Sequence, residues 1–203
     1  MGLNIGIFGG AFDPPHAAHL ALARCAIDQL GLDALRLFPT GQAWHKANAL
    51  SAAGHRLAMV RLAFGGLEKV VVDARELERP GPTYTLDTLR ELRREWPDAR
   101  LTLLLGADQA AALPTWHGWT DILALATVAV ALRADAAGAA KPFDPRSLPG
   151  LPASARFETL MLAPMDMSAT DIRARVAAGQ DITGLVSPAV ARYIDQHHLY
   201  RNT

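Results

Sequence analysis

Short apolar runs alternate with longer helical patterns along most of this chain. The runs that predict buried strands cover residues 3–8, 35–39, 70–73, 101–105 and 127–132. Between them, residues 52–64 and 84–96 place apolar side chains at helical spacing. A repeated alternation of strand and helix is typical of a parallel sheet with helices on both faces. The pattern therefore predicts an α/β protein built on a doubly wound parallel sheet.

The pattern changes after the fifth run. Residues 134–155 combine an Ala/Gly run with four prolines, which predicts a long surface loop, either a tolerated insertion or a loop that closes over a substrate. One more strand is expected at 157–162, and two helices are expected at 170–178 and 187–197. We expect one domain over 1–203, with a core at 1–163 and a C-terminal helical segment at 164–203.

The junction after the first run carries the strongest chemical signal. Gly9-Gly10 let the backbone turn sharply and approach a ligand without Cβ clashes. Asp13 is expected to cap the helix that follows. His16 and His19 then lie three residues apart in its first turn, on one face. Both imidazoles would look toward an anion held at the helix N-terminus.

Three other interpretations of this junction compete with anion binding. A His-x-x-His pair can be half of a zinc site, but Cys25 is the only cysteine and no matching ligand cluster follows. The two histidines can also be plain solvated residues at a helix start. A dinucleotide site is disfavoured, because Gly6-x-x-Gly9-Gly10 lacks the G-x-G-x-x-G spacing.

Residues 9–19, GGAFDPPHAAH, resemble the HxGH signature of the nucleotidyltransferase superfamily, with Ala18 where the family usually has glycine. The resemblance implies a Rossmann-like fold in which the two histidines contact the nucleotide triphosphate and stabilise charge as the α-phosphate is attacked. It also implies an ATP site whose residues in this segment are Gly9, Gly10, Ala11, Phe12, His16 and His19.

Residues 39–46, PTGQAWHK, resemble the P-x-x-x-P-P-H-K segment of bacterial nicotinate-nucleotide adenylyltransferases. Ala43-Trp44 replaces the double proline, while His45-Lys46 is retained. The resemblance implies that Lys46 neutralises polyphosphate as charge moves to the leaving group. An ordinary solvated lysine is the simpler alternative.

Residues 167–173, MSATDIR, resemble the I-S-S-T-x-I-R motif of the same superfamily. The hydroxyls of Ser168 and Thr170, exposed helix amides and the forked cation of Arg173 would form a second anion cradle. The alternative is local, because Ser168-x-x-Asp171 also has the spacing of a capping box.

Two further segments indicate the acceptor substrate. Residues 82–89 resemble the [ST]-Y-T-x-x-T-L signature of the nicotinate-nucleotide branch, and residues 106–116 resemble its G-x-D…L-P-x-W block. The resemblance implies that Asp108 lies against the nucleotide site and that the Trp116 indole stacks on a pyridine ring. A buried core tryptophan is the alternative. The expected nicotinate mononucleotide site consists of Thr83, Tyr84, Thr85, Trp116 and His117, with backbone amides near Thr85 and His117 holding the carboxylate.

The composition limits the partners. The 203 residues include 20 basic and 20 acidic side chains, so the formal net charge is zero and a broad surface for nucleic acid or an anionic membrane is disfavoured. No apolar run is long enough to span a membrane, and no signal segment precedes the first strand. A lone cysteine suits a reducing, cytoplasmic setting.

Together the resemblances imply an enzyme of NAD biosynthesis that transfers AMP from ATP to nicotinate mononucleotide and releases pyrophosphate. Mg²⁺ would be held mainly by the phosphates, with no protein side chain as a ligand. Alternatives are a related transferase that uses nicotinamide mononucleotide or phosphopantetheine, and a non-catalytic nucleotide sensor. The expected partners are small molecules, and a homo-oligomer is left open. The candidate catalytic residues are His16, His19, Lys46 and Arg173.

Overall fold

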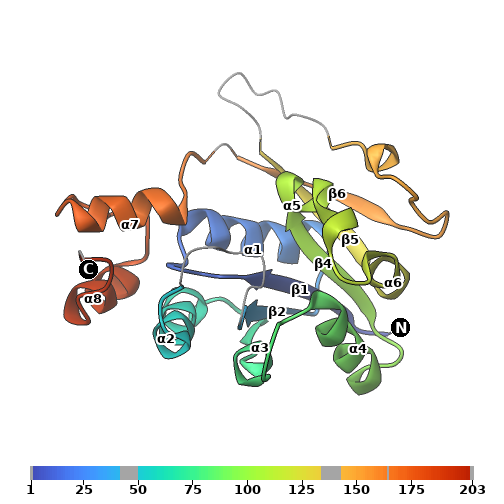
Figure 1. Ribbon diagram of the computed structural model, residues 1–203, viewed down its shortest axis with the longest axis horizontal. Helices are drawn as coiled ribbons and strands as arrows, with labels where there is room; N and C mark the ends of the chain where they lie inside the picture. The colour runs from blue at the N-terminus through green and yellow to red at the C-terminus, as the bar shows by residue number, and fades with distance from the viewer. Residues whose placement is uncertain (1, 42–49, 134–142, 164, 202–203) are drawn as a thin grey trace.

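The computed structural model describes residues 2–41, 50–133, 143–163 and 165–201. Six parallel strands form one sheet in the order β3-β2-β1-β4-β5-β6 (Figure 1). The strands are β1 (Asn4–Gly10), β2 (Ala34–Pro39), β3 (Val70–Val72), β4 (Arg100–Gly106), β5 (Thr127–Arg133) and β6 (Phe157–Leu162). This order is doubly wound, as predicted, and its direction reverses between β1 and β4.

The helices follow the predicted pattern with additions. They are α1 (Ala17–Gln29), α2 (Ala53–Phe64), α3 (Arg75–Glu78), α4 (Thr85–Glu95), α5 (Ala107–Ala111), α6 (Trp119–Leu125), α7 (Ala169–Ala177) and α8 (Pro188–Gln196). A short 3-10 turn, η1 (Leu113–Thr115), joins α5 to α6. The sequence did not single out α3, α5 and α6, because helices this short show too few turns for a clear period.

Each face of the sheet has its own apolar core. In β4, Leu103 and Leu105 belong to one core, whereas Leu104 belongs to the other, because successive side chains of a strand point to opposite faces. Residues of α4 and α6 cover the first of these cores. The second core is completed by residues of α1 and α2 and by the C-terminal helices, through buried Ile172 and Ile194. The C-terminal helices therefore share a core with the sheet, and they lie beside α2 at one end of the molecule (Figure 1).

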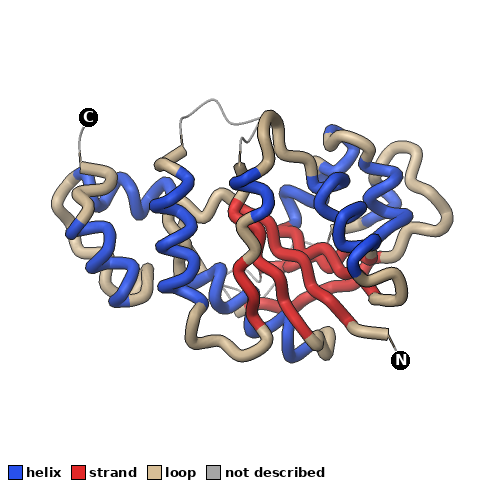
Figure 2. The backbone as a smooth tube through the Cα atoms, turned by 90° about the horizontal axis from the view of Figure 1, so that it is seen from below, coloured by secondary structure: helices blue, strands red, loops and turns tan. Residues whose placement is uncertain are grey.

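The two central strands separate toward their carboxyl ends. The pairing of β1 with β4 ends at Ile7 opposite Leu103. Both strands continue for three more residues on their outer neighbours, β1 to Gly10 beside β2 and β4 to Gly106 beside β5. A crevice at this switch in strand order is where open parallel sheets bind ligands. Figure 2 shows the strands as one continuous twisted layer.

The predicted loop at 134–155 is described from residue 143 onward. Here η2 (Pro145–Ser147) precedes Leu148, which is buried, and the Phe143 ring lies 5.8 Å from that of Phe157 in β6. This part is thus packed against the sheet by apolar side chains, and closure over a substrate stays a prediction. In the described part of the chain, no helix is both long and apolar enough to cross a membrane.

Candidate functional site

The two predicted histidines meet at the start of α1, just after β1 and near the switch in strand order. His16 is the N-cap residue with an extended backbone, and the ring centroids of His16 and His19 are 3.8 Å apart. The Nδ1 atom of His19 accepts a hydrogen bond of 3.1 Å from the backbone N–H of His16. Because Nδ1 is the acceptor, the neutral ring carries its proton on Nε2. The arrangement therefore provides an N–H donor on the side of the ring away from the backbone.

Asp13 does not cap this helix, contrary to the sequence prediction. His16 occupies the N-cap position, and the Asp13 side chain is only 4% exposed. Its Oδ2 atom accepts the backbone N–H of Ser51 at 2.9 Å, and its Oδ1 atom accepts the hydroxyl of Tyr200 at 2.6 Å. Asp13 does not cap α1 because Ser51 and Tyr200, which are remote in sequence, donate to both oxygens of its carboxylate.

Two arginines hold the backbone of the same loop. Arg56, 2% exposed, donates from Nη1 to the carbonyl oxygen of Ala11 at 3.0 Å and from Nε to that of Ser51 at 3.0 Å. Burial lowers the pKa of Arg56, while the nearby Asp13 carboxylate opposes that shift. Arg173 donates to the carbonyl oxygen of Asp13 at 2.8 Å. The backbone before His16 is thus fastened from two different helices.

Gly9, Gly10 and Phe12 lie next to each other in the chain but have different surroundings. A Cβ on Gly9 would have no protein atom within 4 Å, so the backbone there borders open space. A Cβ on Gly10 would lie 3.1 Å from the Phe12 ring. Phe12 has a φ of 48° and is 2% exposed, and its ring centroid lies 5.1 Å from that of His19. The Phe12 side chain therefore supports His19 from the core, which leaves only its main chain for the predicted ATP contact.

At the second predicted anion cradle the structure shows the local alternative, a helix cap, and leaves the cradle a prediction. Ser168 caps α7, because its Oγ accepts the backbone N–H of Asp171 at 3.1 Å and donates to that carboxylate at 2.6 Å. Arg173 also donates to Thr170 Oγ1 at 3.2 Å. The hydrogen bond from Arg173 to Asp13 joins α7 to residues 11–16, the histidine loop. The phosphate contacts of these residues stay predictions, and Lys46 lies outside the described residues.

The two predicted acceptor segments meet in the structure. The rings of Tyr84, before α4, and His117, before α6, lie 4.5 Å apart at a tilt of 33°. Gly118 has a φ of 61°, and a Cβ there would lie 2.4 Å from the Leu86 side chain, so the turn packs closely on α4. Trp116 is half-buried against the core that α4 covers. Its indole is therefore partly a core side chain and partly exposed.

Glu76 is a buried acid in this region that no sequence pattern indicated. It is 6% exposed, and Thr88 donates a hydrogen bond of 2.7 Å to its Oε1. Its carbonyl oxygen accepts the hydroxyl of Thr83 at 3.4 Å, so the predicted Thr83 hydroxyl faces the protein. Burial raises the pKa of Glu76 to about 7. Asp108, by contrast, lies exposed in the first turn of α5.

Arg56 and Tyr200 were also missed, for different reasons. Arg56 left a signal, because it stands in the otherwise apolar stripe of α2 with Met59, Val60 and Ala63. A charged residue on a core-facing stripe is a buried polar group that needs partners. Tyr200 left no local signal, since its partner Asp13 is 187 positions away.

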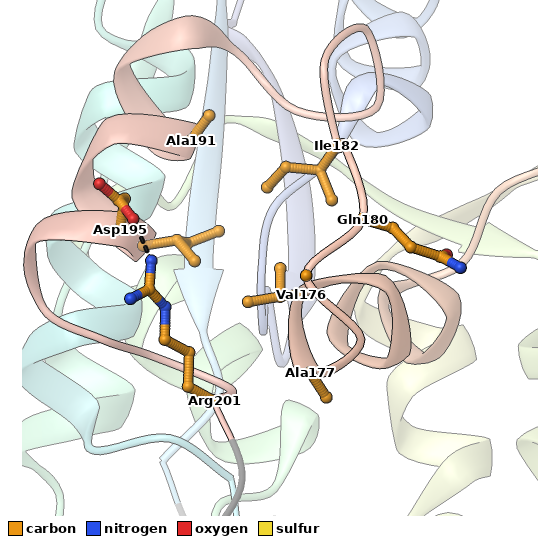
Figure 3. A pocket seen from close by; sticks show the side chains of 9 residues that line it. Val176, Ala177, Gln180, Ile182, Ala191, Asp195 and Arg201 are labelled. Carbon is orange, nitrogen blue, oxygen red and sulfur yellow. Dashed lines mark hydrogen bonds and ion pairs between the residues drawn. The ribbon is translucent and has the colours of Figure 1, made fainter.

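A hollow of about 510 Å³ lies elsewhere, between α7 and α8 (Figure 3). It is lined by Val176, Ala177, Gly179, Gln180, Ile182, Ala191, Ile194, Asp195 and Arg201. The lining contains none of the predicted site residues. Among the described residues, no group of three or more His, Cys, Asp or Glu side chains could hold a metal ion.

The fold and the paired histidines define the class, an α/β nucleotidyltransferase, and the cytidylyltransferase-like family model matches residues 7–175. A relative from Albidiferax ferrireducens, named a probable nicotinate-nucleotide adenylyltransferase, is 55% identical over 98% of both chains. One of the same name from Methylibium petroleiphilum is 44% identical over 97% of this chain and 92% of its own. This chain belongs to the nicotinate-nucleotide adenylyltransferase family.

Solved structures confirm the fold. The nicotinic acid mononucleotide adenylyltransferase of Plasmodium falciparum, complexed with APC, has a TM-score of 0.77 at 19% identity over 98% of this chain and 97% of its own. The same protein complexed with NaAD has a TM-score of 0.76 at the same identity and coverage. The Rossmann-like architecture expected from the sequence is thus confirmed.

Proposed function

We propose that this protein transfers AMP from ATP to nicotinate mononucleotide, producing deamido-NAD and pyrophosphate. Family membership supports the reaction, and one relative named for it is 55% identical to this chain. The observation that carries the assignment to a site is the pair of imidazoles 3.8 Å apart, at the helix that follows β1, where the strand order switches between β1 and β4. The expected small-molecule partners are therefore ATP and nicotinate mononucleotide, in a cytoplasmic setting.

The reaction needs no nucleophile from the protein. A 5′-phosphate oxygen of nicotinate mononucleotide attacks the α-phosphorus of ATP, a new P–O bond forms, and the bond to pyrophosphate breaks. Positioning and stabilisation of the developing charge are what the protein supplies. The Nε2–H of His19 is a donor of the kind that such charge requires. His16 is placed to act beside it.

The leaving pyrophosphate would be held by the second cradle. A guanidinium carries five N–H donors, so Arg173 can hold Asp13 and Thr170 and still donate to phosphate. Ser168 and Thr170 add hydroxyls from the start of α7. Lys46 completes the set in this proposal. These groups act on the β- and γ-phosphates as charge moves onto them.

The acceptor would bind where Tyr84 meets His117. Trp116 offers an indole face for the pyridine ring. Backbone N–H groups near Thr85 and His117 would bind the carboxylate. Asp108, in the first turn of α5, would border the nucleotide.

Mg²⁺ is part of the proposal as an ion held mainly by phosphate oxygens. When bound, it supplies positive charge that neutralises the triphosphate. We expect activity to depend on added Mg²⁺ and to survive a zinc-selective chelator. The check is turnover with each treatment, together with elemental analysis. Stoichiometric zinc that is required for turnover would contradict this.

Pyrophosphate release from ATP tests the proposed function. The purified protein is assayed with nicotinate mononucleotide, nicotinamide mononucleotide and phosphopantetheine in turn, and His19→Ala serves as the inactive control. We expect the highest kcat/KM with nicotinate mononucleotide. Turnover with phosphopantetheine alone would assign another acceptor, and binding of ATP without turnover of any acceptor would indicate a nucleotide sensor.

A further inference from the structure

The C-terminal tail, residues 197–201 after α8, contacts the histidine loop. The hydroxyl of Tyr200 donates a hydrogen bond of 2.6 Å to Oδ1 of Asp13, across 187 positions of sequence. Asp13 is 4% exposed and Tyr200 is half-buried, so the contact is largely shielded from solvent. A carboxylate in such a place needs donors, and a hydrogen bond to a charged group is stronger than one between neutral groups.

The backbone of the tail adopts an unusual conformation on both sides of Leu199. After α8 ends, His198 and Tyr200 both adopt left-handed conformations, with φ of 51° and 62°. Residues other than glycine adopt this region only at a cost, so surrounding contacts must hold it. The backbone N–H of Leu199 donates to Ile194 at 3.0 Å, and Arg201 pairs with Asp195 (Figure 3). The residues on either side of Tyr200 are thus anchored to α8.

The Tyr200 hydroxyl is a permanent donor here. Burial, followed by the hydrogen bond to Asp13, raises the pKa of Tyr200 well above its usual value. The other oxygen of Asp13 accepts the N–H of Ser51, which precedes α2. One carboxylate therefore joins the histidine loop to two segments that are remote in sequence.

We propose that Tyr200 is a positioning residue for adenylyl transfer. Through Asp13 it holds the backbone of residues 11–16, so that the imidazoles of His16 and His19 stay aligned on the α-phosphate. This inference rests on the proposed function. Tyr200 itself touches neither substrate, and its effect falls on the rate of the chemical step, because misplacement of catalytic groups raises the barrier.

Tyr200→Phe tests the inference, because it removes only the hydroxyl. The matched control is Tyr193→Phe, which removes the hydroxyl that meets His55 Nδ1 at 3.0 Å, between α8 and α2. We expect Tyr200→Phe to lower kcat about 10-fold, the size expected for a hydrogen bond to a charged group. The KM of nicotinate mononucleotide should change less than about twofold. Tyr193→Phe should keep the kcat of the parent within about twofold, at a comparable melting temperature.

A double-mutant cycle shows whether the effect passes through Asp13. Asp13→Asn should lower kcat by itself, and adding Tyr200→Phe to it should cost less than about twofold more. Independent losses would contradict the route through Asp13. A kcat for Tyr200→Phe within about twofold of the parent would overturn the proposal, as would an equal loss in Tyr193→Phe. If Tyr200→Phe does not fold, Asp13→Asn alone carries the same expectation for kcat and KM.

A separate readout distinguishes this inference from the proposed function. If the parent protein turns over none of the acceptors, the proposed function fails, and hydrogen exchange of the backbone amides within residues 11–16 is measured instead. Faster exchange of this segment in Tyr200→Phe but not in Tyr193→Phe would still support a tail that positions the histidine loop. Equal exchange in all three proteins would overturn it.

Discussion

The histidine loop (residues 11–16) and the acceptor region (Glu76 to Glu91 with Trp116 and His117) differ in how far apart in sequence their contacting residues lie. The hydrogen-bond donors that hold residues 11–13 are one backbone N–H and three side chains, and they come from 38, 45, 160 and 187 positions away. In the acceptor region, Thr88 bonds Glu76 and Arg79 bonds Glu91, each pair 12 positions apart. Alignment of the histidines is therefore a property of the whole fold, whereas the acceptor region depends largely on one local unit of consecutive elements.

The two regions also treat buried charge differently. Around the loop, the carboxylate of Asp13 and the guanidinium of Arg56 lie close enough to influence each other. In the acceptor region, burial favours the neutral form of Glu76. We expect changes near the loop to act mainly on kcat. Changes near Tyr84 and Trp116 should act on acceptor KM, and changes at Glu76 on the pH dependence of stability.

The largest effect is expected at the loop. His19→Ala should lower kcat on the order of 100- to 1,000-fold, because a donor to developing charge is lost. The KM of ATP should change little, since the contact strengthens in the transition state. His198→Asn is the control, because this exposed histidine has a φ of 51°, which asparagine tolerates. Steady-state kinetics decide the matter, and a kcat within about threefold of the parent would contradict the role of His19.

The next effect concerns Glu76 and acts on stability. The pKa of Glu76 is raised from 4.5 to about 7 in the folded protein, so between these pH values the folded state binds more protons than the unfolded state. The free energy of unfolding should therefore fall by about 3 kcal/mol as pH rises through this window. Glu76→Gln should lack this component.

Urea unfolding of the parent and Glu76→Gln at pH 4.5 and pH 8 measures the component as a difference of differences. Glu91→Gln serves as the control, because this partly exposed acid belongs to the same network. A gap between the parent and Glu76→Gln that does not change with pH would contradict a raised pKa.

The preference between acceptors is expected to be smaller. Backbone N–H donors suit a carboxylate better than a carboxamide, whose NH₂ group cannot accept their hydrogen bonds. An unmatched buried contact costs about 1 to 3 kcal/mol, which is roughly 5-fold to 150-fold in kcat/KM. Assays with nicotinate and nicotinamide mononucleotides measure it. Equal kcat/KM for the two acceptors would contradict a carboxylate-binding site in the acceptor region.

The smallest effect is expected at Trp116. Trp116→Ala should raise the KM of nicotinate mononucleotide roughly 2- to 12-fold, the range for an aromatic pair worth about 0.5 to 1.5 kcal/mol. The KM of ATP should stay near that of the parent. Trp119→Ala is a control, because Trp119 packs against the same core. A defect in ATP alone, or equal defects in both variants, would indicate core packing in place of stacking.

Several features of the protein could be read from local pattern alone. Apolar runs predicted the first five strands, because burial in a parallel sheet leaves continuous apolar segments, and the strand expected at 157–162 is also present. The spacing of His16 and His19 predicted two imidazoles at one helix start, and the structure places them together. The segments around Tyr84 and His117 were expected in one site, and their rings are in contact.

Tertiary structure decided how the histidine loop is held. Asp13 satisfies the local rule for a helix cap, yet its carboxylate binds Ser51 and Tyr200. Burial explains the difference, because an ionised carboxylate away from water takes the strongest donors within reach, wherever they stand in the sequence. A bond between positions 187 apart produces no periodicity, so only the folded chain reveals it. The chemistry of the site is local in sequence, and its alignment is not.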